Sequence, residues 1–475
     1  MPRTALILLF LLTGPILARG DDLKASSSDP RLIEQPRADY RARRKELMDR
    51  VNKSESSRIS FSKDQGGETI VVLRGEDDRG QEDFEEGRFR QKNDFAYLTG
   101  LEVPGAWLVL RPRQNRATLY LPSPTRSHMN GQSRHPGPGK DAAEQFGFDA
   151  VEPNAKLLGD LFTAIADPMR DGAGTAVVYT MSPSPDPHNT KPDAKFVRFL
   201  REGAPNTTFR DLAPVVGEMR KLKSKSELVL LQKAIDITGD ANEEVLKIIG
   251  PGLFEYQLEG RILGAFLNGG ALRPGFQSIV GSGPNSTIPH YFLSSRKMAE
   301  GDLVVVDIGA EYNLYTADVT RTYPVNGTFS PRQREIYQLV LDAQTEAANR
   351  VKPGSTRLVE MTGIARGYLR KSPLRAKDSD GKEFTMDHFF VHGLSHYLGM
   401  DVHDVGDMNK PMQPGEVFTI EPGIYIESEN LGVRIEDDYL VTESGLVKLS
   451  KNIPSEPDEI EKRIATERAR KKHSD

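Results

Sequence analysis

The sequence predicts two globular domains: an α/β domain, then a larger domain in which helices alternate with strong strands. Length and composition give the first indication. The chain has 475 residues, 37% hydrophobic and 28% charged, which suits two or three domains of ordinary size. The second indication is a strong helix start at Ser224, which follows alternating strand and helix patterns that end near Val216. We place the domain boundary just before this helix, between residues 217 and 218.

The overall composition excludes several classes of protein. The net charge of −5 is small for this length, and no basic patch precedes the last residues, so we expect no nucleic-acid partner. The chain has no cysteine, which excludes disulfides, thiolate metal sites and a cysteine nucleophile. Any metal ion must therefore be held by His, Asp and Glu side chains.

The first 20 residues have the pattern of a signal peptide. Arg3 precedes an apolar run at 5–17, and small residues at Ala18 and Gly20 match a cleavage site. This run has 13 residues, short of the roughly 20 that a membrane-spanning helix needs. We therefore expect a signal peptide at residues 1–20, export to a periplasmic or secreted location, and no stable membrane insertion.

The first domain is expected at residues 61–217, after a polar leader at 21–60 that is helical around Tyr40 to Val51. Its strands are indicated by β-branched runs bounded by turn residues. The predicted elements are strands at 68–75 and 175–182, two strands within 106–123 joined by a turn at 113–115, a helix at 157–166 and a Gly/Pro-rich loop at 125–141. This alternation indicates an α/β domain.

The second domain is expected at residues 218–453 and begins with a well-defined helix. Ser224 and Glu227 form a capping box, and Gly250-Pro251-Gly252 ends the helix. Apolar residues recur on one face of this helix. That face consists of Leu228, Leu231, Ile235, Thr238, Val245 and Ile249. The charged segment at 454–475 is predicted to be a solvated helical tail.

Two aspartates are expected to face each other on paired strands. The buried-strand run at 303–306 ends on Asp307, and a second strand at 315–323 contains Asp318. A turn centred between Tyr312 and Asn313 would place Asp307 directly opposite Asp318, with Cβ atoms roughly 5 Å apart. Two buried carboxylates at that distance need a shared proton or a cation.

Two glutamates occupy similar positions nearer the C-terminus. The strand EVFTIEPG (416–423) ends its apolar run on Glu421, and the strand GVRIEDDYLVT (432–442) buries Glu436 with Arg434 on the same face. Either glutamate alone would more often be a surface residue. Four such carboxylates beside a histidine cluster instead favour a metal site.

The charge of this set indicates how many ions it holds. Asp307, Asp318, Glu421 and Glu436 carry four negative charges, which two divalent cations neutralise and one does not. Oxygen-rich ligands favour Mn²⁺, with Co²⁺ and Zn²⁺ as alternatives. Two ions that share bridging carboxylates would generate hydroxide at neutral pH and polarise a substrate carbonyl.

The histidine cluster lies in HGLSHYLGMDVHDVG (392–406), which contains His392, His396 and His403. The first two have the spacing of a zincin helix, but the zincin glutamate is absent and Gly393 is a poor mid-helix residue. Residue chemistry alone does not decide which histidine is a metal ligand.

Together these motifs resemble those of the pita-bread metallopeptidases, and most closely the Xaa-Pro aminopeptidase (aminopeptidase P) family. The resemblance rests on Asp307 with Asp318 eleven residues later, on HGLSHYLGMDVHDVG, and on IEPGIY and RIEDD, and it covers about residues 90–450. It implies a creatinase-like α/β N-terminal domain followed by an α+β pita-bread catalytic domain.

The resemblance also implies how the five ligands divide. Asp307 would bind one metal ion, and Asp318 and Glu436 would bridge both ions. His396 and Glu421 would bind the other ion, and Glu421 would also shuttle a proton during catalysis.

Three further histidines and an arginine are implied to act on the substrate. His290, in STIPHYF, and His403 would hold the substrate and stabilise the tetrahedral oxyanion. His392 and Arg434 would support substrate binding.

The implied activity is release of the N-terminal residue from peptides with proline in second position, by attack of a metal-bridging hydroxide on the scissile carbonyl. Prolidase (Xaa-Pro dipeptidase), which has the same ligands, is the main alternative. A non-catalytic peptide-binding protein of the same fold is a second alternative; such proteins lose ligands, whereas here all five are present. A homo-oligomer stays open.

Overall fold

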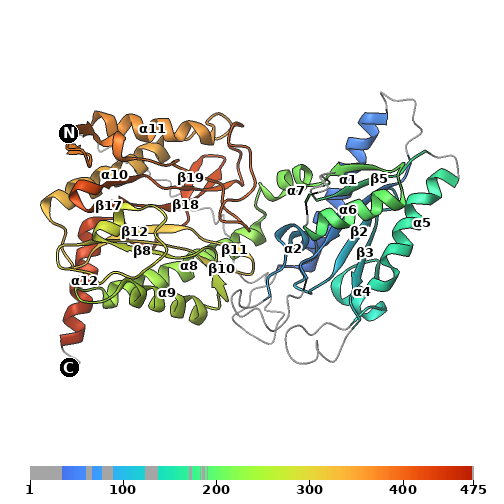
Figure 1. Ribbon diagram of the computed structural model, residues 1–475, viewed down its shortest axis with the longest axis horizontal. Helices are drawn as coiled ribbons and strands as arrows, with labels where there is room; N and C mark the ends of the chain where they lie inside the picture. Colours follow the sequence, from blue (N-terminus) through green and yellow to red (C-terminus); the bar gives the residue numbers. More distant parts are fainter. Residues whose placement is uncertain are drawn as a thin grey trace, which may run out of the picture.

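The computed structural model describes residues 35–59, 67–77, 89–123, 137–170, 174–181, 183, 188–189 and 191–472. The described elements form two domains that lie side by side, with α7 (Ala213–Arg220) and α8 (Lys225–Ile248) near their junction (Figure 1). The predicted signal peptide and most of the predicted loop at 125–141 lie outside the described residues.

The N-terminal domain is built on a six-stranded mixed sheet, which confirms the predicted α/β class. The strand order is β4-β3-β2-β1-β5-β6. The β1/β2 and β2/β3 pairs are antiparallel, and the other three pairs are parallel. The strands are β1 (Thr69–Arg74), β2 (Trp107–Arg111), β3 (Arg116–Leu121), β4 (Ala150–Pro153), β5 (Val177–Thr180) and β6 (Thr208–Asp211).

Helices cover both faces of this sheet. Val71 and Leu73 of β1 pack in a core with side chains of α1 and α2, whereas Ile70 and Val72 pack on the opposite face with side chains of α5. Burial on both faces explains why β1 is apolar throughout rather than alternating. The helices of this domain are α1 (Arg37–Ile59), α2 (Asn93–Thr99), α4 (Lys140–Phe146), α5 (Leu157–Arg170), α6 (Pro192–Gly203) and α7.

The second half of the predicted leader at 21–60 is part of the N-terminal domain. Residues 37–59 form α1, a 23-residue helix. Leu47, Met48 and Val51 of α1 are buried in the core with Phe95 of α2. The polar composition of this stretch hid an apolar stripe of only a few residues, and tertiary packing stabilises the helix.

The C-terminal domain has helices on two sides of a set of short sheets (Figure 1). The helices are α8, whose predicted capping box is present, α9 (Glu255–Gly269), α10 (Pro331–Asn349), α11 (Leu358–Lys371) and α12 (Pro457–Lys472). The sheets have the orders β12-β9-β8, β15-β18-β19, β11-β10-β7, β13-β14 and β16-β17. This is the predicted α+β arrangement.

The strands of this domain are mostly short. They are β7 (Arg273–Pro274), β8 (Ile279–Ser282), β9 (Leu303–Ile308), β10 (Ala310–Tyr312), β11 (Tyr315–Thr316), β12 (Val319–Pro324), β13 (Arg375–Lys377), β14 (Glu383–Thr385), β15 (Val417–Ile420), β16 (Gly423–Ile426), β17 (Leu431–Arg434), β18 (Asp437–Thr442) and β19 (Gly445–Lys448).

The predicted pairing of Asp307 with Asp318 is wrong, because the turn lies one residue later in the sequence than predicted. Asp307 lies opposite Thr320, and the turn is centred between Asn313 and Leu314, which have φ values of 47° and 68°. This two-residue, left-handed turn has no glycine to reveal it. Moving the turn centre by one residue shifts the pairing by two, so Asp318 keeps the same face and lies diagonally to Asp307.

Breaks between strands position three of the carboxylates. Asp318 lies between β11 and β12, and Glu421 lies between β15 and β16. The segment 432–442, predicted to be one strand, is instead divided into β17 and β18, with Ile435 and Glu436 between them. These carboxylates therefore project from chain segments that lack the regular hydrogen bonds of a sheet.

The charged C-terminal tail is helical as predicted, but it is not solvated on all sides. Ile460 and Ile464 of α12 are buried in the domain core. Arg468 donates hydrogen bonds to the carbonyl oxygens of Val325 and Asn326. Among the described helices, none is both long enough and apolar enough to cross a membrane.

Candidate active site

One cavity of about 430 Å³ in the C-terminal domain brings together every site residue that the sequence suggested. These residues are His290, Asp307, Asp318, His392, His396, His403, Glu421, Arg434 and Glu436. They come from segments up to about 150 residues apart in sequence (290 to 436), and the strand breaks described above direct the carboxylates toward a common space.

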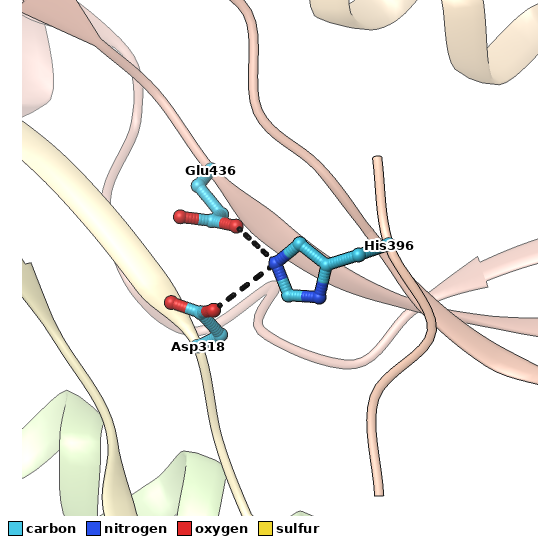
Figure 2. Close-up of side chains that lie close together, drawn as sticks. All are labelled: Asp318, His396 and Glu436. Carbon is cyan, nitrogen blue, oxygen red and sulfur yellow. Dashed lines mark ion pairs between the residues drawn. The ribbon is translucent and has the colours of Figure 1, made fainter. Parts of the chain in front are cut away.

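His396 points its Nε2 atom into the carboxylates (Figure 2). This atom lies 3.3 Å from Asp318 Oδ2 and 3.7 Å from both Glu436 Oε1 and Glu421 Oε1. The candidate ligand atoms of Asp318, His396 and Glu436 all lie within 4.8 Å of one another. Such a cluster of one imidazole and several oxygens has the donor set of a divalent metal site.

The tautomer of His396 also suits a ligand. Its Nδ1 atom lies 3.1 Å from the carbonyl oxygen of Tyr397, which can only accept a hydrogen bond. Nδ1 therefore carries the proton, and the Nε2 lone pair faces the carboxylates. A backbone carbonyl that orients the ring in this way is a usual support for a metal-binding histidine.

His392 is held differently, and both of its ring nitrogens are in use. Nδ1 lies 2.7 Å from the carbonyl oxygen of Gly393, and Nε2 lies 2.8 Å from the hydroxyl of Tyr425. Burial first, and then the charge of Arg434, lowers the pKa of His392 to about 4. The ring is thus neutral near pH 7, and neither nitrogen has a free lone pair for a metal ion.

Several buried carboxylate oxygens at the site have no hydrogen-bond partner. They are Oδ1 of Asp307, Oδ1 of Asp318 and Oε1 of Glu436. Burying a carboxylate oxygen costs free energy of folding unless a hydrogen-bond donor or a cation faces it. The residues present therefore fit a group of bound cations.

The electrostatics of the cluster lead to the same conclusion. Burial, reinforced by the charge of Asp307, raises the pKa of Asp318 well above its ordinary value. Burial and the charge of Asp318 do the same to the pKa of Glu436. Burial raises the pKa of Glu421 to about 7. Without a cation the protein opposes ionisation of all three groups, and divalent ions would relieve this.

Arg434 is a buried cation within the same cluster. Its Nη2 atom donates to Asp307 Oδ2 at 2.6 Å, and its Nη1 atom donates to the hydroxyl of Tyr425 at 2.8 Å. Since the Tyr425 hydroxyl accepts from Arg434, its own proton is available to His392. One chain of hydrogen bonds therefore links Asp307, Arg434, Tyr425 and His392.

Tyr425 is the residue at this site that sequence reasoning missed. It lies in the quoted motif IEPGIY, but a tyrosine in an apolar strand is ordinary. Its diagonal relation to Arg434 arises because β16 pairs with β17, with Gly423 opposite Arg434 and Tyr425 opposite Gly432. Only a correct prediction that these two strands pair in this register would have placed Tyr425 beside Arg434.

His403 and His290 lie on the walls of the cavity. The His403 ring centre is 4.3 Å from that of His396. Burial first, and then the nearby His396, lowers the pKa of His403. His290 is exposed at the rim, with its ring parallel to that of Phe292 at 6.1 Å. Both line the same cavity as the carboxylates.

A network of ion pairs holds the loop that carries His403. Asp404, the next residue, accepts from Lys223 at 3.0 Å and from Arg220 at 2.6 Å. The same guanidinium donates to Asp401 and to Asp94 of the N-terminal domain, each at 2.7 Å. The loop is thus tied to the junction between the two domains.

Comparison with known protein families agrees with this geometry. The model described as metallopeptidase family M24 matches residues 229–443, and the model described as aminopeptidase P, N-terminal domain, matches residues 40–169. The fold and site define a metallopeptidase. The chain belongs to metallopeptidase family M24, with an aminopeptidase P type N-terminal domain.

Within this family, the chain is similar to Xaa-Pro aminopeptidases. It is 36% identical over 403 residues to the Xaa-Pro aminopeptidase of Escherichia coli K12, a match that covers 78% of this chain and 88% of the relative. It is also 36% identical to the Xaa-Pro dipeptidase of Pyrococcus furiosus, over 247 residues that cover 51% of this chain and 67% of that relative.

Solved structures extend the similarity to the whole fold. Aminopeptidase P from E. coli with the inhibitor Pro-Leu superposes with a TM-score of 0.77 at 31% identity, over 92% of this chain and all of that chain. A zinc-substituted form of E. coli aminopeptidase P in complex with product has a TM-score of 0.76 at 32% identity, over 91% of this chain and 99% of that chain.

Proposed function

We propose that this chain is a dinuclear metal-dependent Xaa-Pro aminopeptidase, which releases the N-terminal residue of peptides with proline in second position. The observation that carries the proposal is the cluster of Asp318, His396 and Glu436 in one cavity, with buried carboxylate oxygens that lack partners in the described structure. Relatives named for this activity match along most of their length, which supports the same substrate class.

Five side chains would hold two divalent ions: Asp307, Asp318, His396, Glu421 and Glu436. The four carboxylates and Arg434 together carry a charge of −3, so two divalent ions leave +1, which one anionic ligand balances. Four of the five ligands are carboxylates, which favours Mn²⁺, with Co²⁺ and Zn²⁺ as substitutes. Bound ions would supply an activated water and polarise the scissile carbonyl.

Glu421 is suited to accept a proton and return it. Burial raises the pKa of its carboxyl to about 7 in the metal-free protein. Bound cations would lower that pKa, so the carboxylate would be ionised and able to accept a proton. Its carboxylate lies between His396 and His392, at 3.7 Å and 3.8 Å from their nearest nitrogens. It can thus exchange a proton with the leaving amine while it remains beside the metal ligands.

His403 and His290 would donate hydrogen bonds to the substrate carbonyl groups. They lie on the cavity walls in front of the carboxylates, where a peptide bond would be placed. An N–H aimed at a developing oxyanion stabilises the transition state more than the ground state. His392 and Arg434, locked together through Tyr425, would form the fixed wall against which the peptide binds.

The remaining cavity lining suits a proline ring next to a free amine. Its apolar part consists of Phe276, Ile279, Pro289, Phe292 and Val402. The carboxylate cluster would attract the α-ammonium group of a peptide N-terminus, which favours an exopeptidase. These two features explain selection for the first two residues of a peptide.

Prolidase activity is the alternative. The aminopeptidase match extends over both domains, whereas the dipeptidase match covers 51% of this chain. This difference favours the aminopeptidase.

A peptide panel tests the proposal. The protein with residues 1–20 removed is given Xaa-Pro, Xaa-Pro-Yaa and Xaa-Ala-Yaa peptides with Mn²⁺, Co²⁺ or Zn²⁺. We expect release of Xaa from Xaa-Pro-Yaa. Cleavage of the dipeptide alone would assign a prolidase, and no cleavage with any metal would refute the enzyme.

We also propose export and removal of residues 1–20. Mass determination of the N-terminus after expression with its own leader tests this, and an intact Met1 in an intracellular fraction would contradict it. A homo-oligomer is proposed from the family resemblance alone, and light scattering of the purified protein measures it.

A further inference from the structure

The two glutamates proposed as metal ligands lie at breaks between paired strands. Glu421 lies between β15 and β16, and Glu436 lies between β17 and β18. Buried backbone groups need hydrogen-bond partners, and a break in a strand removes the partners that a sheet would supply. Other groups must therefore hold these two segments in place.

The side chain of Gln344 donates to one backbone carbonyl in each of these segments. Gln344 lies on α10 and is 1% exposed. Its Nε2 atom donates to the carbonyl oxygen of Ile420 at 2.9 Å and to that of Ile435 at 3.3 Å. Each of these carbonyls belongs to the residue just before a proposed ligand. One amide group thus joins the two segments that carry Glu421 and Glu436.

Other contacts fix each segment separately. The N–H of Glu436 donates to Thr320 O at 3.1 Å, and Arg321 donates to Glu436 O at 2.7 Å. The N–H of Glu421 donates to Leu394 O at 2.8 Å. Between the two segments, the N–H of Ile435 also reaches Pro422 O, at 3.3 Å. The flanking strand pairs β15/β18 and β16/β17 join the chain on either side of the breaks, and Gln344 adds a side-chain link from α10 at the breaks themselves.

We propose that Gln344 is a positioning residue that sets the spacing between the Glu421 and Glu436 carboxylates, and so sets the affinity of the site for divalent ions. Groups behind metal ligands typically contribute about 10- to 100-fold in affinity, because they hold the ligands in the geometry that the ion requires. The proposal rests on the metal site of the proposed function, but not on its peptide specificity.

The test is a calorimetric titration of metal-free protein with Mn²⁺ alone, without peptide. Gln344→Met keeps the length of the side chain and removes the amide. We expect it to weaken Mn²⁺ binding about tenfold or more. Gln344→Asn keeps the amide on a shorter stem, and we expect a smaller loss of affinity. Measuring both keeps the test decisive if the methionine variant does not fold.

Asn242 provides a matched control for burial of an amide. It is 0% exposed on α8, donates to Thr238 O at 2.9 Å and accepts from the Tyr323 hydroxyl at 2.8 Å. We expect Asn242→Leu to lower the melting temperature of the metal-free protein while Mn²⁺ affinity stays within about twofold of wild type, since no proposed ligand is involved.

The outcomes separate this inference from the proposed function. Wild-type affinity in both Gln344 variants would overturn the inference, as would an equal loss of affinity in the Asn242 control. Failure of the wild-type protein to bind any divalent ion would instead overturn the proposed function.

Discussion

Arg434 and Asp307 form a buried ion pair in which the guanidinium Nη2 lies 2.6 Å from the carboxylate Oδ2. The same guanidinium donates to Tyr425, so a single cation orients one proposed metal ligand and, through the tyrosine, His392. Hydrogen bonds thus connect a proposed metal ligand to the residues that would face the substrate.

Loss of this cation should damage both stability and catalysis. Arg434→Met leaves Asp307 buried and unpaired, which typically costs about 3–5 kcal/mol. We expect a lower melting temperature and a fall in kcat/KM of at least about 100-fold on an Xaa-Pro-Yaa peptide with Mn²⁺. The control is Arg332→Met, which breaks a surface pair with Glu429 and should cost less than about 1 kcal/mol. Similar effects in both variants would argue against a special role for Arg434.

The two histidines of HGLSH should differ in metal binding. His396→Ala should lose bound metal, because its Nε2 faces three carboxylates. His392→Ala should keep metal, because both of its nitrogens are occupied by Gly393 and Tyr425. It should bind substrate poorly, because the His392 ring forms part of the cavity wall. Metal content by mass spectrometry and KM for the peptide separate these effects. Equal metal loss in both variants would show that the ligand is assigned wrongly.

Metal binding should strengthen as pH rises through about 7. Burial raises the pKa values of Asp318 and Glu436, and it raises that of Glu421 to about 7, so protons compete with metal ions for these carboxylates. In the metal-free protein the same carboxylates should make folding stability fall, not rise, as pH increases. A carboxyl whose pKa is higher in the folded than in the unfolded protein favours the folded state most at pH values below its unfolded pKa. For Glu421 this contribution to the free energy of unfolding is lost as pH rises from about 4.3 through about 7.

Thermal unfolding at pH 5, 6, 7 and 8, with and without Mn²⁺, measures both effects. We expect the stabilisation by Mn²⁺ to grow across this range. A stabilisation that is independent of pH would mean that these carboxylates are not the ligands.

Asp404 should couple the stability of the junction to catalysis. Burial tends to raise its pKa, but Lys223 and Arg220 outweigh burial and the pKa is lowered. Its contribution to stability is therefore present above the unfolded value of about 3.9 and is lost as pH falls through the folded value. Asp404→Asn removes the negative charge that neutralises Lys223 and partly neutralises Arg220. We therefore expect the free energy of unfolding to fall by about 3 kcal/mol.

Because Asp404 adjoins His403, this variant should also lower kcat more than it raises KM. Asp407→Asn, a change at a half-buried position on the same loop whose side chain pairs with Lys410, is the control and should leave both parameters near wild type. A change in stability without any change in kcat would place Asp404 in a structural role only.

Local signals explain what the sequence could predict of the fold. The capping box at Ser224, the strand at 68–75 and the turn at 113–115 depend on neighbouring residues and are present in the structure. The Asn313-Leu314 turn could not be placed, because two left-handed residues without glycine leave no clear pattern. The break at Ile435 and Glu436 also escaped prediction, since Thr320 and Arg321, more than 100 residues away, donate the hydrogen bonds that hold Glu436.

The site divides in the same way. Sequence motifs, together with the family resemblance that they carry, suggest nine residues, and the fold gathers all of them in one cavity. Tyr425 and Gln344 give no such signal because each is an ordinary residue of its strand or helix. Only the tertiary fold brings their polar atoms to Arg434 or to the carbonyls of Ile420 and Ile435.

A titration of metal-free protein with Mn²⁺, in which bound ions and release of Xaa from an Xaa-Pro-Yaa peptide are followed together, tests the central claim most directly. Two ions per chain, with activity that appears as the sites fill, is the predicted result. Binding of no ion, or cleavage of the peptide by protein that holds no metal, would contradict it.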